Sequence, residues 1–318
     1  DRYSGYRTVE RPNTNTGVAT YTTLDESVWV IPLVWAFDLV RSGLPPEQAA
    51  AIADRLLAPA AEYLVEHHYG AIHNFSCWHN AAIGTVGLVL DRRDLVQFAI
   101  DGEFGFHAQL RDGVLSDGLW FEGSTSYHFY ALAGILSLAK ATCHIPDLDL
   151  RTHPTLPAML SAPIQYAYPD GSLPALNDCW YFTGLLGDCC HGVPPAAAFY
   201  EIGYAWYDDP QFARVLHSAY THIPRDSLDA LLFGKDEIPT DGLQPQPSVN
   251  MAGSGYAILR SPPPDPEFRP EGQQYLLLKY GPHGGSHGHP DKLSLILYTH
   301  GRRLAPDLGT PGYSLDLF

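Results

Sequence analysis

A long series of helical segments constrains the fold of this chain more than any other feature. Apolar residues recur with helical spacing in successive segments, and short loops rich in glycine and proline separate them. Helices joined by such short loops pack as helical hairpins. Strands do not alternate with these helices, which argues against a Rossmann or TIM-barrel architecture. The predicted helices cover residues 26–40, 46–66, 78–90, 92–111, 126–142, 154–166, 195–207 and 211–222.

The character of the sequence changes near Phe233. Residues 238–248 are rich in proline, glycine and glutamine, as expected of a linker. Short strand-like runs follow and predict an antiparallel β-domain. Because so few strands leave an open sheet edge, we expect the chain to be cut from a longer one. The predicted strands cover residues 255–259, 275–280, 293–298 and 303–305, and we place the domain boundary between residues 240 and 241.

Composition and charge exclude several classes of partner. Of 318 residues, 45% are hydrophobic and 17% are charged, which predicts a globular chain with a large core. A formal net charge of −16 argues against nucleic acid or an anionic membrane bound through bulk charge. An anionic substrate remains compatible with a local pocket of His and Arg. The oligomeric state has no signature in the sequence.

Cysteine usage and the chain start bear on the compartment. The five cysteines include an adjacent pair, which does not resemble a disulfide framework, so free thiols in a reducing compartment are expected. No apolar stretch approaches the roughly 20 residues of a membrane span. The chain starts at Asp1 with no visible signal peptide, although a leader could have been removed. We expect a cytoplasmic protein, with secretion or a periplasmic location as the alternative.

One histidine-rich segment looks like an active site. Within nine residues it contains His283, His287, His289 and Asp291, and it leads into the apolar run 293–298. In an extended segment, histidines at i and i+2 lie on the same face. Glycines at positions 281, 284, 285 and 288 would permit tight turns and the close approach of a ligand.

Two more clusters combine aromatic with polar residues. The first, HNFSCWHN, covers residues 73–80, and the second, DGLWFEGSTSYHFY, covers residues 117–130. Aromatic rings pack against the C–H faces of pyranoses, while His, Asn and carboxylate groups bind sugar hydroxyls. The two clusters therefore predict a sugar-binding cleft.

These motifs, in this order, resemble those of the heparinase II/III-like polysaccharide lyases. NFSCWHNAAIG, DGLWFEGSTSYHFY, HGGSHGHPDKLS and APDLGTPGY carry the resemblance, which extends over about residues 71–312 and is strongest to the oligo-alginate lyase branch. It implies an incomplete (α/α) toroid over residues 1–240 and an antiparallel β-sandwich that begins in residues 241–318. It also implies β-elimination on a uronate-containing polysaccharide, here alginate or oligo-alginate, with exolytic action.

β-Elimination accounts for the residue types in the motifs. The reaction removes the C5 proton of a uronate and expels the 4-O-linked sugar. The C5–H group becomes acidic enough only when donors such as Asn and His neutralise the developing enolate-like charge. A base must accept the proton, and an acid must protonate the leaving oxygen. Tyrosine can serve in either role if nearby donors or positive charge lower its pKa from about 10.

The resemblance implies roles for individual residues. Tyr127 matches the catalytic tyrosine of the family. Related lyases have a His or Asn some 55 positions earlier, and 127 − 73 = 54 points to His73, with Asn74 beside it as the group that neutralises the uronate carboxylate. His79 is the competing choice for His73. His287 matches the first histidine of the family's HxH pair, which contributes to the catalytic centre.

Metal and substrate contacts follow from the same resemblance. His289 and Asp307 match positions that bind a divalent metal, typically zinc, in some members, and a third ligand would lie beyond Phe318. The substrate is expected to be an acidic polysaccharide or oligosaccharide. The residues expected to line its cleft are Trp78, Asn80, Trp120, Glu122, Tyr130 and His283.

Several alternatives stay open at this point. Tyr130 could replace Tyr127 as the acid, and the substrate could be heparin or heparan sulfate. An inverting (α/α) glycoside hydrolase would use Asp117 or Glu122 with Asp178. HxHxD at residues 287–291 superficially resembles an amidohydrolase motif, but the βα repeats of that fold are absent. A catalytically inactive carbohydrate-binding protein is the remaining class. Residues 189–191 read as buried thiols beside a loop histidine rather than as a metal site.

Overall fold

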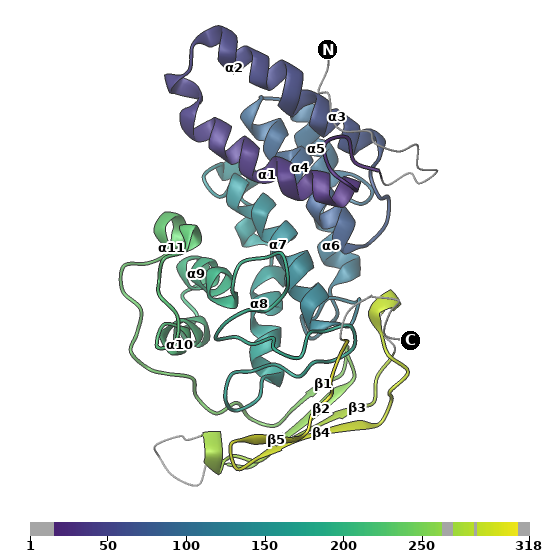
Figure 1. Cartoon of the computed structure of the whole chain (residues 1–318), viewed down its shortest axis with the longest axis vertical. Coiled ribbons are helices and arrows are strands. Elements are labelled where there is room, and N and C mark those ends of the chain that lie inside the picture. The colour runs from purple at the N-terminus through teal and green to yellow at the C-terminus, as the bar shows by residue number, and fades with distance from the viewer. Residues whose placement is uncertain (1–15, 263–269, 283–284, 311–318) are drawn as a thin grey trace. The chain divides into compact units, whose positions relative to one another are not determined.

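The structure is a computed structural model that describes residues 16–262, 270–282 and 285–310 (Figure 1). The chain divides into two compact units. Unit 1 comprises residues 1–113 and 131–152, and unit 2 comprises residues 114–130 and 153–318. The helices of the first part are α1 (Thr23–Val40), α2 (Pro46–Ile52), α3 (Ala58–Glu66), α4 (Asn74–Val89), α5 (Arg93–Asp101), α6 (Phe106–Gly113) and α7 (Thr125–Thr142). Next come α8 (Thr155–Tyr166), α9 (Ala196–Tyr207), α10 (Pro210–Ala219) and α11 (Leu228–Phe233).

Most of the predicted helices form close to their expected bounds, and local sequence signals explain where they begin and end. The Thr22 hydroxyl accepts a hydrogen bond from the Asp25 N–H, and the Asp25 carboxylate accepts one from the Thr22 N–H, which caps α1. Residues 92–111, predicted as one helix, form α5 and α6 instead. Gly102 ends α5, because a Cβ there would lie 2.3 Å from the carbonyl oxygen of Phe98.

Helix α4 forms the centre of unit 1. It packs against α1, α3 and α5, and nearly every residue between Asn74 and Gly87 is buried. Two glycines let the neighbouring side chains approach the α4 backbone. A Cβ at Gly84 would lie 2.6 Å from a methyl group of Leu138, and one at Gly87 would lie 2.9 Å from the Cβ of Leu95. The segment that carries the first aromatic and polar motif is therefore also the core of this unit.

Unit 2 contains an antiparallel sheet whose five described strands follow one another in sequence order (Figure 1). The strands are β1 (Val249–Met251), β2 (Tyr256–Arg260), β3 (Tyr275–Lys279), β4 (Ser294–Thr299) and β5 (Arg302–Ala305). Strand β1 was not predicted. One face is buried and rich in tyrosine, and the other exposes Leu259, Leu295 and Leu304. Lys279 takes the last inward-facing position of β3, which brings an ammonium group into the core.

The predicted fold class, a helical part followed by an antiparallel sheet, is confirmed. The boundary between residues 240 and 241 stays a prediction. In the described part of the chain, no helix combines the length and hydrophobicity that a membrane span requires.

Candidate functional site

Tyr127 and His287 are stacked ring on ring in unit 2. Their ring centroids lie 3.5 Å apart, and the planes are inclined by 16°. Tyr127 lies in the first turn of α7, and His287 ends a short 3₁₀ turn, Gly285–His287. The expectation of an extended segment at His287 is therefore wrong. Gly285 has a positive φ of 40°, and a Cβ on it would lie 3.2 Å from the Cα of Glu122, so this tight turn passes directly over the Glu122 backbone.

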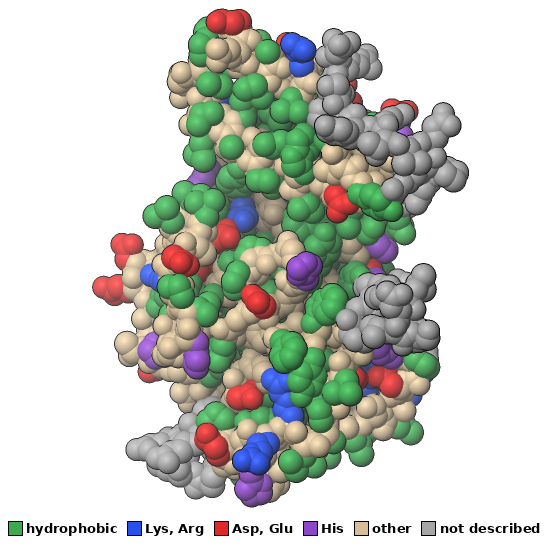
Figure 2. All heavy atoms as spheres, in the orientation of Figure 1, with side chains coloured by type: hydrophobic (Ala, Val, Ile, Leu, Met, Phe, Trp, Pro, Cys, Tyr) green, Lys and Arg blue, Asp and Glu red, His purple; other side chains and the backbone are tan. Residues whose placement is uncertain are grey.

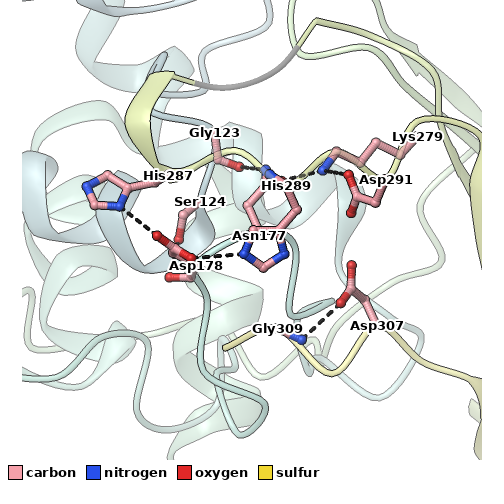
Figure 3. Close-up of polar contacts among 10 residues, drawn as sticks. All are labelled: Gly123, Ser124, Asn177, Asp178, Lys279, His287, His289, Asp291, Asp307 and Gly309. Carbon is pink, nitrogen blue, oxygen red and sulfur yellow. Dashed lines mark hydrogen bonds and ion pairs between the residues drawn. The ribbon is translucent and has the colours of Figure 1, made fainter. Parts of the chain in front are cut away.

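A single carboxylate joins the two histidines of the HxH pair (Figure 3). Asp178 Oδ2 lies 2.8 Å from His287 Nδ1, and Asp178 Oδ1 lies 2.9 Å from His289 Nε2. The Asp178 N–H also donates to the His287 carbonyl, 3.2 Å away. Hydrogen bonds from a carboxylate to a ring nitrogen fix the orientation of the imidazole. Both histidines are thus oriented by one residue.

A second carboxylate approaches the other nitrogen of His287. Glu122 Oε1 lies 3.6 Å from His287 Nε2, and the Glu122 side chain is 1% exposed. The indole N–H of Trp120 donates to the other oxygen of Glu122. His287 therefore has a carboxylate near each ring nitrogen and a phenol ring against its face.

A buried lysine and an asparagine hold the pieces of this site together. Lys279, 2% exposed, donates from Nζ to Asn177 Oδ1 and to Asp291 Oδ1. Asn177 Oδ1 also accepts from the His289 N–H at 2.9 Å, and its Nδ2 donates to the carbonyl of Gly123 at 2.6 Å. Asn177 has a left-handed backbone, with φ of +59°. This network ties the segment before α7 to the segment that carries the histidines.

The predicted residues His73, Asn74 and His79 lie in unit 1. His73 caps α4, since its Nδ1 accepts the Phe75 N–H at 3.2 Å, and its ring packs 4.5 Å from that of Tyr69. The side chain of His73 is partly exposed, whereas Asn74 and His79 are fully buried. Burial lowers the pKa of His79 to about 3, so this histidine is neutral at ordinary pH. Exposure therefore favours His73 over His79 as the residue that could contact a substrate.

The residues expected to bind substrate differ in exposure. Trp78 and Trp120 are 6% and 1% exposed. Asn80 donates from Nδ2 to the Phe104 carbonyl at 2.8 Å, and its Oδ1 lies 3.1 Å from His68 Nε2. Tyr127 and Tyr130 are both partly exposed. His283 lies outside the described residues. Contacts of these side chains with substrate stay predictions.

The donors expected to bind zinc are engaged with other groups. His289 Nε2 pairs with Asp178, and Asp307 Oδ1 accepts the Gly309 N–H at 2.9 Å. The described residues contain no group of three or more His, Cys, Asp or Glu that could hold a metal ion. They do not by themselves complete a zinc site, so zinc stays a prediction and no chemical step is derived through it.

Sequence reasoning overlooked the residues that organise the site. From the sequence, residues 177–178 read first as a turn that could also line the cleft with Trp180 and Tyr181, and Asp178 was a candidate carboxylate of a hydrolase. One signal was available for Lys279, because the alternation in YLLLK places a lysine at an inward position of a strand. Nothing local indicates that Asp178 meets His287, since 109 positions separate them.

Two family models match different parts of the chain. Residues 29–168 match the alginate lyase model, and residues 243–315 match the model of the heparinase II/III-like C-terminal domain. The resemblance recognised in the sequence motifs is thereby confirmed.

Curated relatives point the same way. An alginate lyase of Stenotrophomonas maltophilia is 27% identical over 301 residues, covering 90% of this chain and 38% of the relative. An exo-oligoalginate lyase of Saccharophagus degradans is 26% identical over 318 residues, covering 91% of this chain and 40% of the relative. The chain thus spans about two fifths of the length of these relatives.

Solved structures support the fold. A heparinase III structure matches with a TM-score of 0.65 and 18% identity, covering 98% of this chain and 47% of that one. A heparan sulfate lyase of Pedobacter heparinus matches with a TM-score of 0.62 and 22% identity, covering 92% and 41%. At these identities the likeness establishes the fold alone.

Proposed function

We propose that this chain, which carries an alginate lyase domain and a heparinase II/III-like C-terminal domain, belongs to an enzyme that cleaves an acidic polysaccharide by β-elimination. The observation that carries the proposal is the stacked pair of Tyr127 and His287, with Asp178 holding the imidazole. Such a pair provides a proton-transfer group and an oriented neighbour that assists it.

Tyr127 is the proton-transfer group in this proposal. In the reaction, the C5 proton leaves to a base, the C4–O4 bond breaks, and the electron pair of the C5–H bond forms the C4–C5 double bond. The departing O4 takes up a proton. A cationic imidazole stacked on a phenol ring stabilises the phenolate form and so assists the departure of the phenol proton. His287 is placed for this task, because Asp178 fixes its ring against that of Tyr127. The roles of His73 and Asn74 remain as the resemblance implies.

The substrate we propose is alginate or an oligo-alginate, cleaved exolytically. Both curated relatives named above are alginate-type lyases. A sulfated substrate would require a dense cluster of Arg and Lys. On the face drawn in Figure 2, Lys and Arg side chains are few and scattered. The chain has only 19 Lys and Arg against 35 Asp and Glu.

The decisive experiment measures ultraviolet absorbance of the unsaturated uronate that only elimination produces. Alginate, its oligomers and heparin serve as parallel substrates for the wild type and for Tyr127→Phe. We expect absorbance to rise with alginate in the wild type and the rate to fall by about 10³-fold in the variant, because the ring is kept and only the proton-transfer hydroxyl is lost. Tyr130→Phe is the matched control and tests the alternative acid.

Other outcomes would assign the chain differently. A rise with heparin alone would keep elimination and replace the substrate. New reducing ends without absorbance would indicate hydrolysis, with Glu122 and Asp178 as the carboxylates to test. If Tyr130→Phe rather than Tyr127→Phe abolished the rise, the stacked pair would lose its proposed role.

We also propose that His289 and Asp307 contribute to a zinc site in the whole protein. Elemental analysis of the purified protein should find zinc, and Asp307→Asn should lower its content. A zinc-free protein with full activity would contradict this proposal.

A further inference from the structure

The loop that follows Asp178 encloses a pocket of about 550 Å³ in unit 2. This volume lies within the range of small-molecule sites, roughly 300–1,000 Å³. All residues that line the pocket fall between positions 180 and 193. The lining relevant here comprises Trp180, Phe182, Thr183, Asp188, Cys190 and His191.

Hydrogen bonds fix the shape of this loop. Thr183 is buried, and its hydroxyl donates to the Trp180 carbonyl at 3.2 Å. The Gly184 N–H donates to the Asp188 carbonyl at 2.8 Å. From outside the loop, Arg303 donates to the carbonyl of Tyr181 at 3.3 Å and places its guanidinium 5.2 Å from the centre of the Tyr181 ring. The pocket is therefore formed before any ligand binds.

The pocket carries one strongly exposed aromatic ring beside a partly exposed one. Phe182 is 87% exposed, the highest value among the large hydrophobic side chains that the structure describes, and Trp180 is partly exposed. An aromatic ring that is held in water by a fixed loop offers its face to a ligand. Pyranoses present C–H faces that pack on such rings. The rings of Trp180 and Phe182 therefore favour a carbohydrate as the ligand of this pocket.

The polar groups of the pocket restrict how a sugar would bind. Asp188 and His191 are exposed at the pocket and can bond to hydroxyl groups. The Asp188 carboxylate would repel the carboxylate of a uronate. Burial raises the pKa of the Cys190 thiol to about 12. The thiol that lines the pocket is therefore uncharged at neutral pH and is not a nucleophile.

We infer that this pocket is an outlying subsite that binds one pyranose of the substrate chain by its C–H face and its hydroxyls. The uronate carboxylate of that sugar points to solvent, away from Asp188. The inference rests on the proposed function for the identity of the chain that is bound. Residues 180–193 lie between the two matched segments, 29–168 and 243–315.

Kinetics on substrates of different length test this subsite. We expect Phe182→Ala to raise KM for an alginate hexamer by about tenfold, the loss of one ring-stacking contact, and to leave kcat within about twofold. KM for the shortest cleavable oligomer should not change, because it does not reach the subsite. Tyr21→Ala, which removes an exposed ring in unit 1, is the control for losing surface aromatic area. An equal rise in KM for both lengths, or no rise for either, would overturn the inference.

Binding without turnover separates this inference from the proposed reaction. In Tyr127→Phe, saturated alginate hexamer should change the tryptophan fluorescence, and Trp180→Phe should remove that change. Asp188→Asn should tighten hexamer binding severalfold at low salt, because one like charge is removed. If hexamer binding depends on Trp180 but the wild type forms no unsaturated product, the subsite is kept and the lyase proposal is rejected. If the wild type forms unsaturated product and neither binding nor KM depends on Trp180 or Phe182, the lyase proposal is kept and the subsite is rejected.

Discussion

His79 of unit 1 and the pair His287 and His289 of unit 2 lie in opposite environments. In unit 1, His79 is fully buried, its Nδ1 accepts a backbone N–H from Tyr69 at 3.2 Å, and burial keeps it neutral. In unit 2, His287 and His289 share the carboxylate of Asp178. A histidine that only accepts from the backbone supports the fold. One that is oriented by a carboxylate next to a tyrosine is equipped for proton transfer.

Among the changes that separate these two kinds of histidine, the largest effect should come from removing the carboxylate that His287 and His289 share. We expect Asp178→Asn to lower kcat/KM for alginate on the order of 100-fold, because an amide cannot hold both imidazoles in the same orientation. Steady-state kinetics by ultraviolet absorbance measure it. Asp101→Asn is the matched control, since Asp101 also faces a histidine, His107 at 3.9 Å, but with both side chains exposed. Equal activity in the two variants would remove the distinction between the two kinds of histidine.

A smaller effect is expected on stability when the buried lysine is replaced. Lys279→Met should lower the free energy of unfolding by about 2–3 kcal/mol, because Asn177 loses one of its two donors and Asp291 loses its counterion. Urea denaturation measures this change. Lys235→Met provides the comparison, because Lys235 pairs with the exposed Asp208 at 2.6 Å and such pairs contribute about 0–1 kcal/mol. If both variants unfold at the same urea concentration, Lys279 does not hold the site segments together.

The last effect concerns acid stability, and it is the smallest over the range from pH 6.5 to pH 5 that is tested. The pKa of His79 is about 3 in the folded protein against a usual 6.5, so as pH falls protons bind the unfolded chain first. The contribution of His79 to the free energy of unfolding is therefore complete above pH 6.5. It declines as the pH falls towards 3, by about 1.4 kcal/mol per pH unit. His128, whose pKa burial lowers to about 4, should act in the same direction.

His79→Gln tests this linkage. The variant should lose about 2 kcal/mol less than the wild type between pH 6.5 and pH 5, because glutamine binds no proton in that range. Urea denaturation at both pH values measures the difference. Identical pH dependence in the two proteins would show that His79 is already able to bind a proton in the folded state, and the contrast with His287 and His289 would weaken.

Local sequence signals were sufficient for most of the helices and strands. The apolar periodicity and the loops rich in glycine and proline predicted α1, α7 and α9 to within a few residues, and the apolar runs predicted β2 to β5. They failed where a tertiary contact or a single glycine decides the outcome. Gly102 divides a continuous apolar pattern into α5 and α6, and β1 is too short to stand out before its partner β2 is known.

For the site, the sequence determined which chemistry-bearing residues are present. Tyr127, His287 and His289 stand in motifs whose resemblance to the heparinase II/III-like lyases implies proton transfer on a sugar. Only the tertiary structure decided which groups form hydrogen bonds with the histidines and so orient them. Asp178 and Asn177 bond to the histidine segment across 109 and 112 positions, and Lys279 bonds to Asn177 across 102 positions. Hydrogen bonds over such separations depend on how the chain folds back on itself, and no local pattern of residue types encodes them.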